Sequence, residues 1–130
     1  MENGSKQAMP ERQKLVLVVE DNESVRTPLE KFLRLHGFEV MSAITADEAL
    51  DLIAARPPSA AIVDLRLPQG SGRDVIISLP TSVPVVIFSA VPKDADGLER
   101  IRPNTRLILK PFSLTMLVET IKRMLGDADA

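Results

Sequence analysis

The stretch KLVLVVED, residues 14–21, decides the fold. Five apolar residues, Leu15–Val19, follow one another without the alternation of a half-exposed strand, and Glu20 and Asp21 close the run. An uninterrupted apolar run of this length is typical of a parallel strand that is covered on both faces. It therefore predicts a strand inside an α/β sheet that ends at two acids.

The rest of the chain alternates between extended and helical patterns. Further strands are predicted over residues 38–44, 59–64, 83–89 and 106–110, and helices over residues 25–36, 45–55, 73–78, 91–102 and 114–125. Five strands alternating with five helices predict a doubly wound, flavodoxin-like α/β fold with a five-stranded parallel sheet in the order 2-1-3-4-5. Ligands bind to such sheets at the carboxyl ends of the strands.

Local signals mark some of the helix boundaries. A capping box over residues 45–48 is expected to begin the second helix, and Gly126 is expected to end the last one. The helix over residues 91–102 is expected to be short or mobile, because Pro92 and Gly97 each lower helix stability.

Composition limits the class of protein. The length of 130 residues suits one compact domain, and 45% hydrophobic with 26% charged residues is a globular balance. A net charge of −2 and four Phe as the only aromatic residues provide neither a basic stripe nor a stacking platform, so direct nucleic-acid binding is not expected. The lack of Cys excludes disulfides, thiolate nucleophiles and Cys-based zinc sites.

The chain is predicted to consist of a flexible leader over residues 1–13, one domain over residues 14–126 and a tail over residues 127–130. No apolar run approaches the roughly 18 residues that a membrane span needs, and the N-terminus has no signal-peptide pattern. A soluble, cytoplasmic protein without membrane contact is therefore expected.

Polar residues stand where four of the predicted strands end. Glu20 and Asp21 follow the first strand, Asp64 ends the third, Ser89 the fourth and Lys110 the fifth. Because neighbouring strands lie about 4.8 Å apart, acids on the first and third strands can share one ion, and a long lysine on the fifth can reach toward the third. The sequence predicts one site at this edge of the sheet.

Three carboxylates without a neighbouring His or Cys form an all-oxygen site, which favours Mg²⁺ over zinc or copper. A metal ion and a lysine around one carboxylate match the needs of phosphoryl transfer, in which positioning and charge stabilisation do most of the work. Asp64 is then the candidate nucleophile, because carboxylates can form aspartyl phosphates.

Each residue also has an ordinary explanation. Asp21 or Asn22 could cap the first helix, Asp64 could belong to a turn, and Lys110 could end a strand with its charge in water. The functional interpretation depends on finding suitable groups at four adjacent strand ends together.

Four separated segments match one family in order. These are VVED at 18–21, DLRLPQGSG at 64–72, FSA at 88–90 and KPF at 110–112. They resemble the receiver domains of bacterial response regulators, and the resemblance extends over roughly residues 14–125. Each matching segment lies at a predicted strand end, which makes the match specific.

The resemblance implies a metal site and a phosphoacceptor. Asp64 would be phosphorylated, and Mg²⁺ (or Mn²⁺) would be held by Asp21, Asp64, the backbone carbonyl of Arg66 and, through water, Glu20. A sensor histidine kinase or a histidine phosphotransfer protein would donate the phosphoryl group, and a downstream protein would be the target.

The resemblance also assigns the remaining groups. Ser89 would donate a hydrogen bond to the phosphoryl group, and Lys110 would form an ion pair with it. The peptide between Lys110 and Pro111 would be cis. Such a domain is not a turnover enzyme, although self-phosphorylation from a small phosphodonor and self-dephosphorylation at Asp64 are expected.

Two positions depart from the family pattern, and one other function stays open. Glu20 stands where Asp is commoner, and Leu107 where many receivers carry Tyr or Phe, so signalling through residues 91–102 is a hypothesis. The missing aromatic also fits a receiver-like interaction module that does not use phosphate. A haloacid dehalogenase-like hydrolase would carry a second Asp where this chain has Arg66.

Overall fold

The computed structural model describes residues 13–110 and 112–129, the last three of them by their backbone alone. The predicted leader, apart from its last residue, and the predicted cis peptide before Pro111 lie outside the described residues. The predicted domain boundaries stay predictions.

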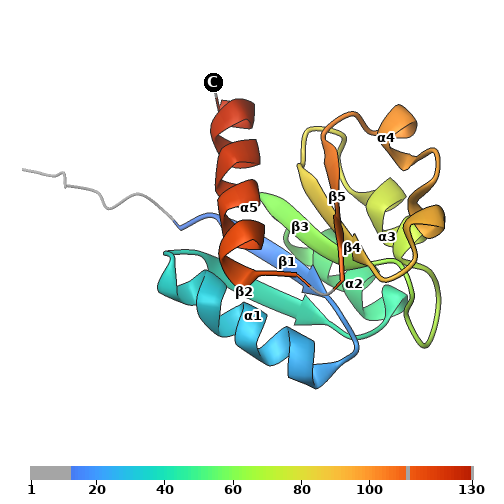
Figure 1. Cartoon of the computed structure of the whole chain (residues 1–130), viewed down its shortest axis with the longest axis horizontal. Helices are drawn as coiled ribbons and strands as arrows, with labels where there is room; N and C mark the ends of the chain where they lie inside the picture. The colour runs from blue at the N-terminus through green and yellow to red at the C-terminus, as the bar shows by residue number, and fades with distance from the viewer. Residues whose placement is uncertain (1–12, 111, 130) are drawn as a thin grey trace, which may run out of the picture.

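A five-stranded parallel sheet in the order β2-β1-β3-β4-β5 forms the centre of the molecule (Figure 1). Its strands are β1 (Leu15–Val19), β2 (Glu39–Ala43), β3 (Ala60–Asp64), β4 (Val85–Ser89) and β5 (Thr105–Leu109). All five residues of β1 are buried, as are those of β3 and β4, because helices cover both faces of the sheet. The predicted fold class and strand order are confirmed.

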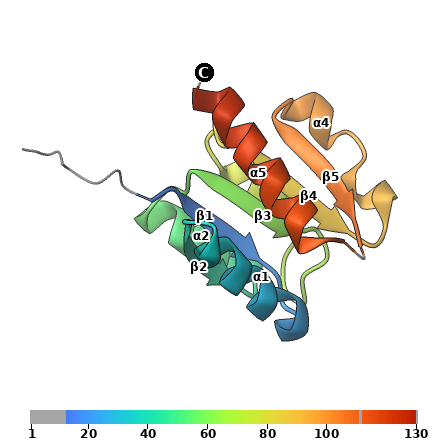
Figure 2. The ribbon, with the colours of Figure 1, turned by 60° about the vertical axis from the view of Figure 1, so that its left-hand side comes forward.

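The helices divide between the two faces. The helical elements are α1 (Glu23–Leu35), α2 (Ala46–Ala55), α3 (Gly72–Ser78), the 3₁₀ turn η1 (Pro92–Ala95), α4 (Leu98–Ile101) and α5 (Leu114–Asp129). One core cluster joins the sheet to α1 and α5, and a second joins it to α2, α3 and α4. Figure 2 shows α1 and α5 together on one face of the sheet. No helix in the described part of the chain has the length and apolarity to cross a bilayer.

The predicted capping box is present. The amide of Glu48 donates to Oγ1 of Thr45, and Oε1 of Glu48 accepts from the amide of Ile44. These bonds satisfy amides that a helix start would otherwise leave without partners. They fix the entry into α2 directly after the carboxyl end of β2.

The segment between β4 and β5 contains little helix, as predicted. It consists of η1 and of α4, which is only four residues long, separated by Gly97 with a φ of +83°. This left-handed backbone conformation interrupts a right-handed helix and suits glycine. The hydrogen bonds of a regular α-helix therefore hold only a small part of residues 91–101.

The prediction that Gly126 ends the last helix is wrong. α5 continues to Asp129. A glycine stops a helix when it adopts a positive φ, and Gly126 is not among the glycines that do so.

Candidate metal and phosphoacceptor site

The three predicted acids meet at the carboxyl edge of the sheet. Glu20 and Asp21 follow β1, and Asp64 ends β3; one carboxylate oxygen from each lies within 4.8 Å of the others. Glu20 and Asp64 are buried, with 0% and 5% of their surface exposed, whereas Asp21 is exposed. An all-oxygen set of this kind fits a hard divalent cation such as Mg²⁺.

Lys110 joins two of these acids from the far side of β4. Its Nζ donates to Oδ2 of Asp64 at 2.9 Å and to Oε1 of Glu20 at 3.0 Å, and lies 4.9 Å from the ring centroid of Phe88. Burial opposes the charge of Lys110, but the hydrogen bonds to both carboxylates outweigh it and raise the pKa of the ammonium. Lys110 therefore stays charged.

Glu20 is a buried acid held by two donors. Its Oε2 accepts from the amide of Asn22 at 3.0 Å, and its Oε1 accepts from Lys110. Burial, together with the charge of Asp64, raises the pKa of Glu20, and the bonds from Asn22 and Lys110 only partly oppose this. An additional cation would offset the same unfavourable charge.

Asp64 is held close to the turn that follows it. Its Oδ1 accepts from the amide of Arg66 at 2.9 Å. Gly72, which begins α3, packs against the same backbone so tightly that a Cβ would lie 2.3 Å from the carbonyl oxygen of Asp64. The turn thus fixes the carboxylate of Asp64. Only glycine fits at position 72, where the chain comes back against the backbone of Asp64.

Ser89 is buried at the end of β4, one residue beyond Phe88, which pairs with Asp64. Its Oγ both donates to the carbonyl of Val91 and accepts from the amide of Val91, each at 3.0 Å. The hydroxyl is therefore engaged with the next loop, and its predicted bond to a phosphoryl group stays a prediction.

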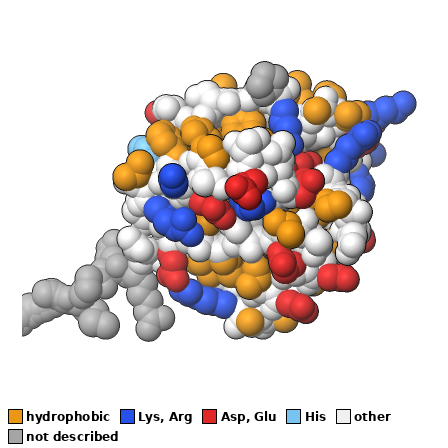
Figure 3. All heavy atoms as spheres, turned by 90° about the horizontal axis from the view of Figure 1, so that it is seen from below, with side chains coloured by type: hydrophobic (Ala, Val, Ile, Leu, Met, Phe, Trp, Pro, Cys, Tyr) orange, Lys and Arg blue, Asp and Glu red, His pale blue; other side chains and the backbone are white. Residues whose placement is uncertain are grey.

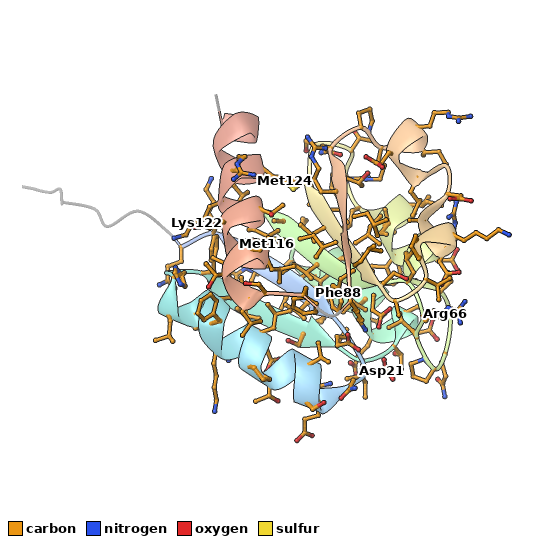
Figure 4. The ribbon with its side chains drawn as sticks, viewed as in Figure 1. Asp21, Arg66, Phe88, Met116, Lys122 and Met124 are labelled. Atoms are coloured by element: carbon orange, nitrogen blue, oxygen red, sulfur yellow. The ribbon has the colours of Figure 1, made fainter. Side chains whose placement is uncertain are left out.

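Two contacts at this edge were missed from the sequence. Nη1 of Arg26 donates to the carbonyls of Glu20 and Asp21 at 3.0 and 3.2 Å. Nε of Arg66 donates to Oδ2 of Asp94 at 2.5 Å. Neither pair has a spacing that would indicate it, because the chain folds back between the partners. Figure 4 shows Asp21 and Arg66 toward the same edge of the sheet as Phe88.

An apolar groove of about 550 Å³ opens beside Lys110. Its lining residues are Ser24, Val25, Pro28, Ala90, Lys110, Phe112 and Leu114. On the face seen in Figure 3, exposed hydrophobic side chains stand among acidic and basic ones.

The fold and the site define a doubly wound α/β protein with an acidic cluster bound to a lysine at the carboxyl edge of its sheet. The model of the response regulator receiver domain matches residues 16–122, and the chain belongs to this family of two-component signalling domains. The predicted family is thus confirmed.

Named relatives agree with this family. The transcriptional regulatory protein PrrA of Mycobacterium tuberculosis is 37% identical over 116 residues, which cover 85% of this chain and 49% of PrrA. The chain therefore spans about half the length of that relative. The polar-differentiation response regulator DivK of Brucella ovis is 34% identical over 122 residues, which cover 88% of this chain and 98% of DivK.

A solved structure shares the fold. The CheY-like response regulator receiver domain protein from Methanospirillum hungatei superposes with a TM-score of 0.81 at 22% identity, covering 91% of this chain and 98% of that one. At this identity the likeness supports the fold alone.

Proposed function

We propose that this domain is a phosphorylation-dependent switch in which Asp64 accepts a phosphoryl group from a phosphohistidine partner. The observation that carries the proposal is the convergence of two carboxylates, those of Glu20 and Asp21, and one charged lysine on a single buried aspartate. Asp64 is the central member, because it ends β3, which lies between β1, the strand that precedes the other two acids, and β4, the strand over which Lys110 reaches.

In the proposed transfer, one carboxylate oxygen of Asp64 attacks the phosphorus. The phosphorus–nitrogen bond breaks, its electron pair stays on the ring nitrogen, and the donor ring, protonated on its other nitrogen, leaves as neutral imidazole. Lys110, already at Oδ2 of Asp64, neutralises charge on the transferred oxygens. Water later attacks the phosphorus, the bond between phosphorus and the Asp64 oxygen breaks, and inorganic phosphate leaves. The carboxylate is thereby restored, so the domain resets without acting on an outside substrate.

Mg²⁺ would be held by Asp21 and Asp64, with Glu20 through water and the carbonyl of Arg66, and when bound it would stabilise negative charge on the transferring group. The donor set supports this assignment because the acids bring more negative charge than Lys110 offsets. Mn²⁺ fits the same oxygen ligands. Ser89 would supply its hydroxyl to the phosphoryl group after leaving Val91.

We further infer that the phosphohistidine protein seats on the apolar groove beside Lys110. A protein donor must bring its imidazole to Asp64, and the groove is lined by Lys110, which contacts that carboxylate. Val25→Glu places a charge in the groove without touching the acids. It should slow transfer from a phosphohistidine protein while leaving phosphorylation by acetyl phosphate unchanged; equal slowing of both would refute the docking site.

The test of the function is incubation with Mg²⁺ and acetyl phosphate, followed by intact mass. The wild type should gain the mass of one phosphoryl group, and Asp64→Asn should gain none. Asp51→Asn, an exposed acid on α2, is the matched control and should behave as wild type. Labelling of Asp64→Asn at the wild-type rate would move the phosphoacceptor elsewhere, and no labelling of the wild type would favour the phosphate-independent interaction module.

A further inference from the structure

An ion pair joins the loop after the phosphoacceptor to η1. Nε of Arg66 donates to Oδ2 of Asp94 at 2.5 Å, and Nη2 of Arg66 lies 3.3 Å from Oδ1, so the guanidinium holds both carboxylate oxygens. Arg66 follows Asp64 by two residues, whereas Asp94 lies within η1, 28 positions further along the chain. The pair thus bridges two loops at the edge of the site.

Arg66 is close to Asp64 as well as to Asp94. Its amide donates to Oδ1 of Asp64 at 2.9 Å, and the charge of Asp64 acts on its guanidinium. The side chain of Arg66 is 67% exposed, so solvent leaves it room to rotate between the two carboxylates. In the unphosphorylated domain Asp94 holds it.

Phosphorylation would change this competition. An exposed ion pair such as that of Arg66 with Asp94 typically shifts an equilibrium by about fivefold or less. A phosphoryl group brings roughly two negative charges and three strong acceptors, and a charge-assisted bond to it typically shifts an equilibrium by about tenfold or more. The stronger acceptor on Asp64 should therefore win the guanidinium.

When the guanidinium of Arg66 leaves Asp94, η1 loses one of the contacts that hold it. Other tethers of this turn are Nη1 of Arg73, which donates to the carbonyls of Asp94 and Asp96 at 2.9 and 3.2 Å, the bonds of Ser89 to Val91, and the packing of Ala95 against the core. The Ser89 bonds are the ones that the proposed phosphoryl contact would also break. Gly97, with its positive φ, lies next and allows the turn to move relative to α4.

We propose that Arg66 exchanges its partner on phosphorylation, leaving Asp94 for the phosphoryl group on Asp64 and thereby releasing η1 as the signal. This inference rests on the proposed function. It supplies a route that needs no aromatic side chain at position 107, because the moving groups are a surface arginine and a 3₁₀ turn. The released surface is residues 91–97.

The test uses the full chain with Mg²⁺ and beryllium fluoride, a phosphoryl mimic for aspartate. Two readouts are followed by NMR: the Nε–H resonance of Arg66 and the exchange of the amides of Asp94 and Asp96, which are bonded within the turn to Val91 and Lys93. In the wild type the Arg66 resonance should shift, and exchange of both amides should accelerate about two- to fivefold.

Variants test separately the two partners proposed for Arg66, Asp94 and the phosphoryl mimic. In Arg66→Gln, hydrogen exchange at the two amides should already be fast before the mimic is added, and the mimic should not accelerate it further. This variant should also bind the mimic about tenfold more weakly than the wild type. Asp94→Asn should bind the mimic about two- to fivefold more tightly, because Arg66 is already free. Arg56→Gln removes another exposed bidentate pair, that with Glu39, and is the matched control with wild-type binding.

The outcomes distinguish the two proposals. If the wild type binds the mimic but Arg66→Gln matches it in affinity and in amide acceleration, the exchange of partners is wrong and the phosphoacceptor stands. If the wild type takes neither the mimic nor a phosphoryl group, both proposals fail together.

Discussion

The Nζ of Lys110 lies 2.9 Å from Oδ2 of Asp64, although 46 positions separate them in the chain. Lys110 follows β5 and Asp64 ends β3, so the side chain crosses over β4, where the ring of Phe88 supports it. The reach of a lysine across one strand turns two distant residues into one electrostatic unit. This unit also contains Glu20, whose burial gives the first prediction.

Without metal, Glu20→Gln should raise the unfolding temperature at pH 7. The pKa of Glu20 in the folded state is raised above 4.5, chiefly by burial. The contribution of Glu20 to the free energy of unfolding is therefore fully present below pH 4.5 and is lost as the pH rises through the folded pKa. The advantage of the variant should shrink as the pH falls toward 4.5, which unfolding curves over pH in a chelator would measure.

Two controls accompany this prediction. Saturating Mg²⁺ should stabilise the wild type, by about 2.7 kcal/mol at 100 times Kd, and Glu20→Gln less. Glu39→Gln should lower stability slightly, because its hydrogen bond with Arg56 lowers the pKa of Glu39 and so adds stability at neutral pH. A Glu20→Gln variant less stable than wild type at pH 7 without metal would contradict the assignment.

The gathering of the acids could be predicted because it depends on topology. Parallel strands in register bring their carboxyl ends to one edge, as the pairing of Val19 with Val63 and of Phe88 with Asp64 shows. The residues found at the strand ends therefore predict which side chains lie close together at this edge. The weak helix after β4 was predictable for a local reason, since Pro92 and Gly97 act on their own backbone.

Side-chain pairing between loops could not be predicted. The sequence contains 18 acidic residues that could pair with Arg66, and only the folded path of residues 91–97 brings Asp94 to it. Likewise, the hydroxyl of Ser89 turns toward Val91 because the chain bends back at that point. The end of α5 was mispredicted because Gly126 can adopt either hand of backbone, and its identity alone does not decide which.

Arg102→Met should destabilise the domain by about 3 kcal/mol. Arg102 is 3% exposed, and its guanidinium donates to the carbonyls of Leu79, Pro80 and Val83 at 2.9, 2.8 and 2.8 Å. Its removal takes this donor from the buried carbonyls of Leu79 and Val83, whereas the carbonyl of Pro80 keeps its bond from the amide of Val83. Urea unfolding measures the loss of stability. The control Arg100→Met, which changes an exposed neighbour, should show almost no loss, and similar losses at both positions would show that the hydrogen bonds of Arg102 do not stabilise the domain.

Leu107→Phe should leave stability within about 1 kcal/mol of the wild type. Leu107 is half-buried and borders a cavity of about 270 Å³ beside η1 and α4, which can take the larger ring. Ile87 pairs with Leu107 across the sheet but is 1% exposed, so Ile87→Phe should overpack the core and cost roughly 1–3 kcal/mol. Chemical denaturation compares the two; equal losses would show that the cavity cannot accept the ring.

Gly72→Ala and Gly126→Ala should change stability in opposite directions. At Gly72 the new Cβ would lie 2.3 Å from the carbonyl oxygen of Asp64 and 2.7 Å from Cα of Leu65, so backbone must move. We expect a loss of roughly 2 kcal/mol or more and slower phosphorylation by acetyl phosphate, because the displaced backbone carries the phosphoacceptor. At Gly126 a Cβ meets nothing within 4 Å.

The second substitution provides the control for the first. Gly126 lies inside α5, where alanine forms helix better than glycine by up to about 1 kcal/mol, so Gly126→Ala should raise stability and leave phosphorylation unchanged. Thermal unfolding and intact mass after acetyl phosphate measure both effects on the same samples. If Gly72→Ala kept wild-type stability and labelling, the tight return of the chain at Gly72 would not be what holds Asp64, and the site would owe its shape to the sheet alone.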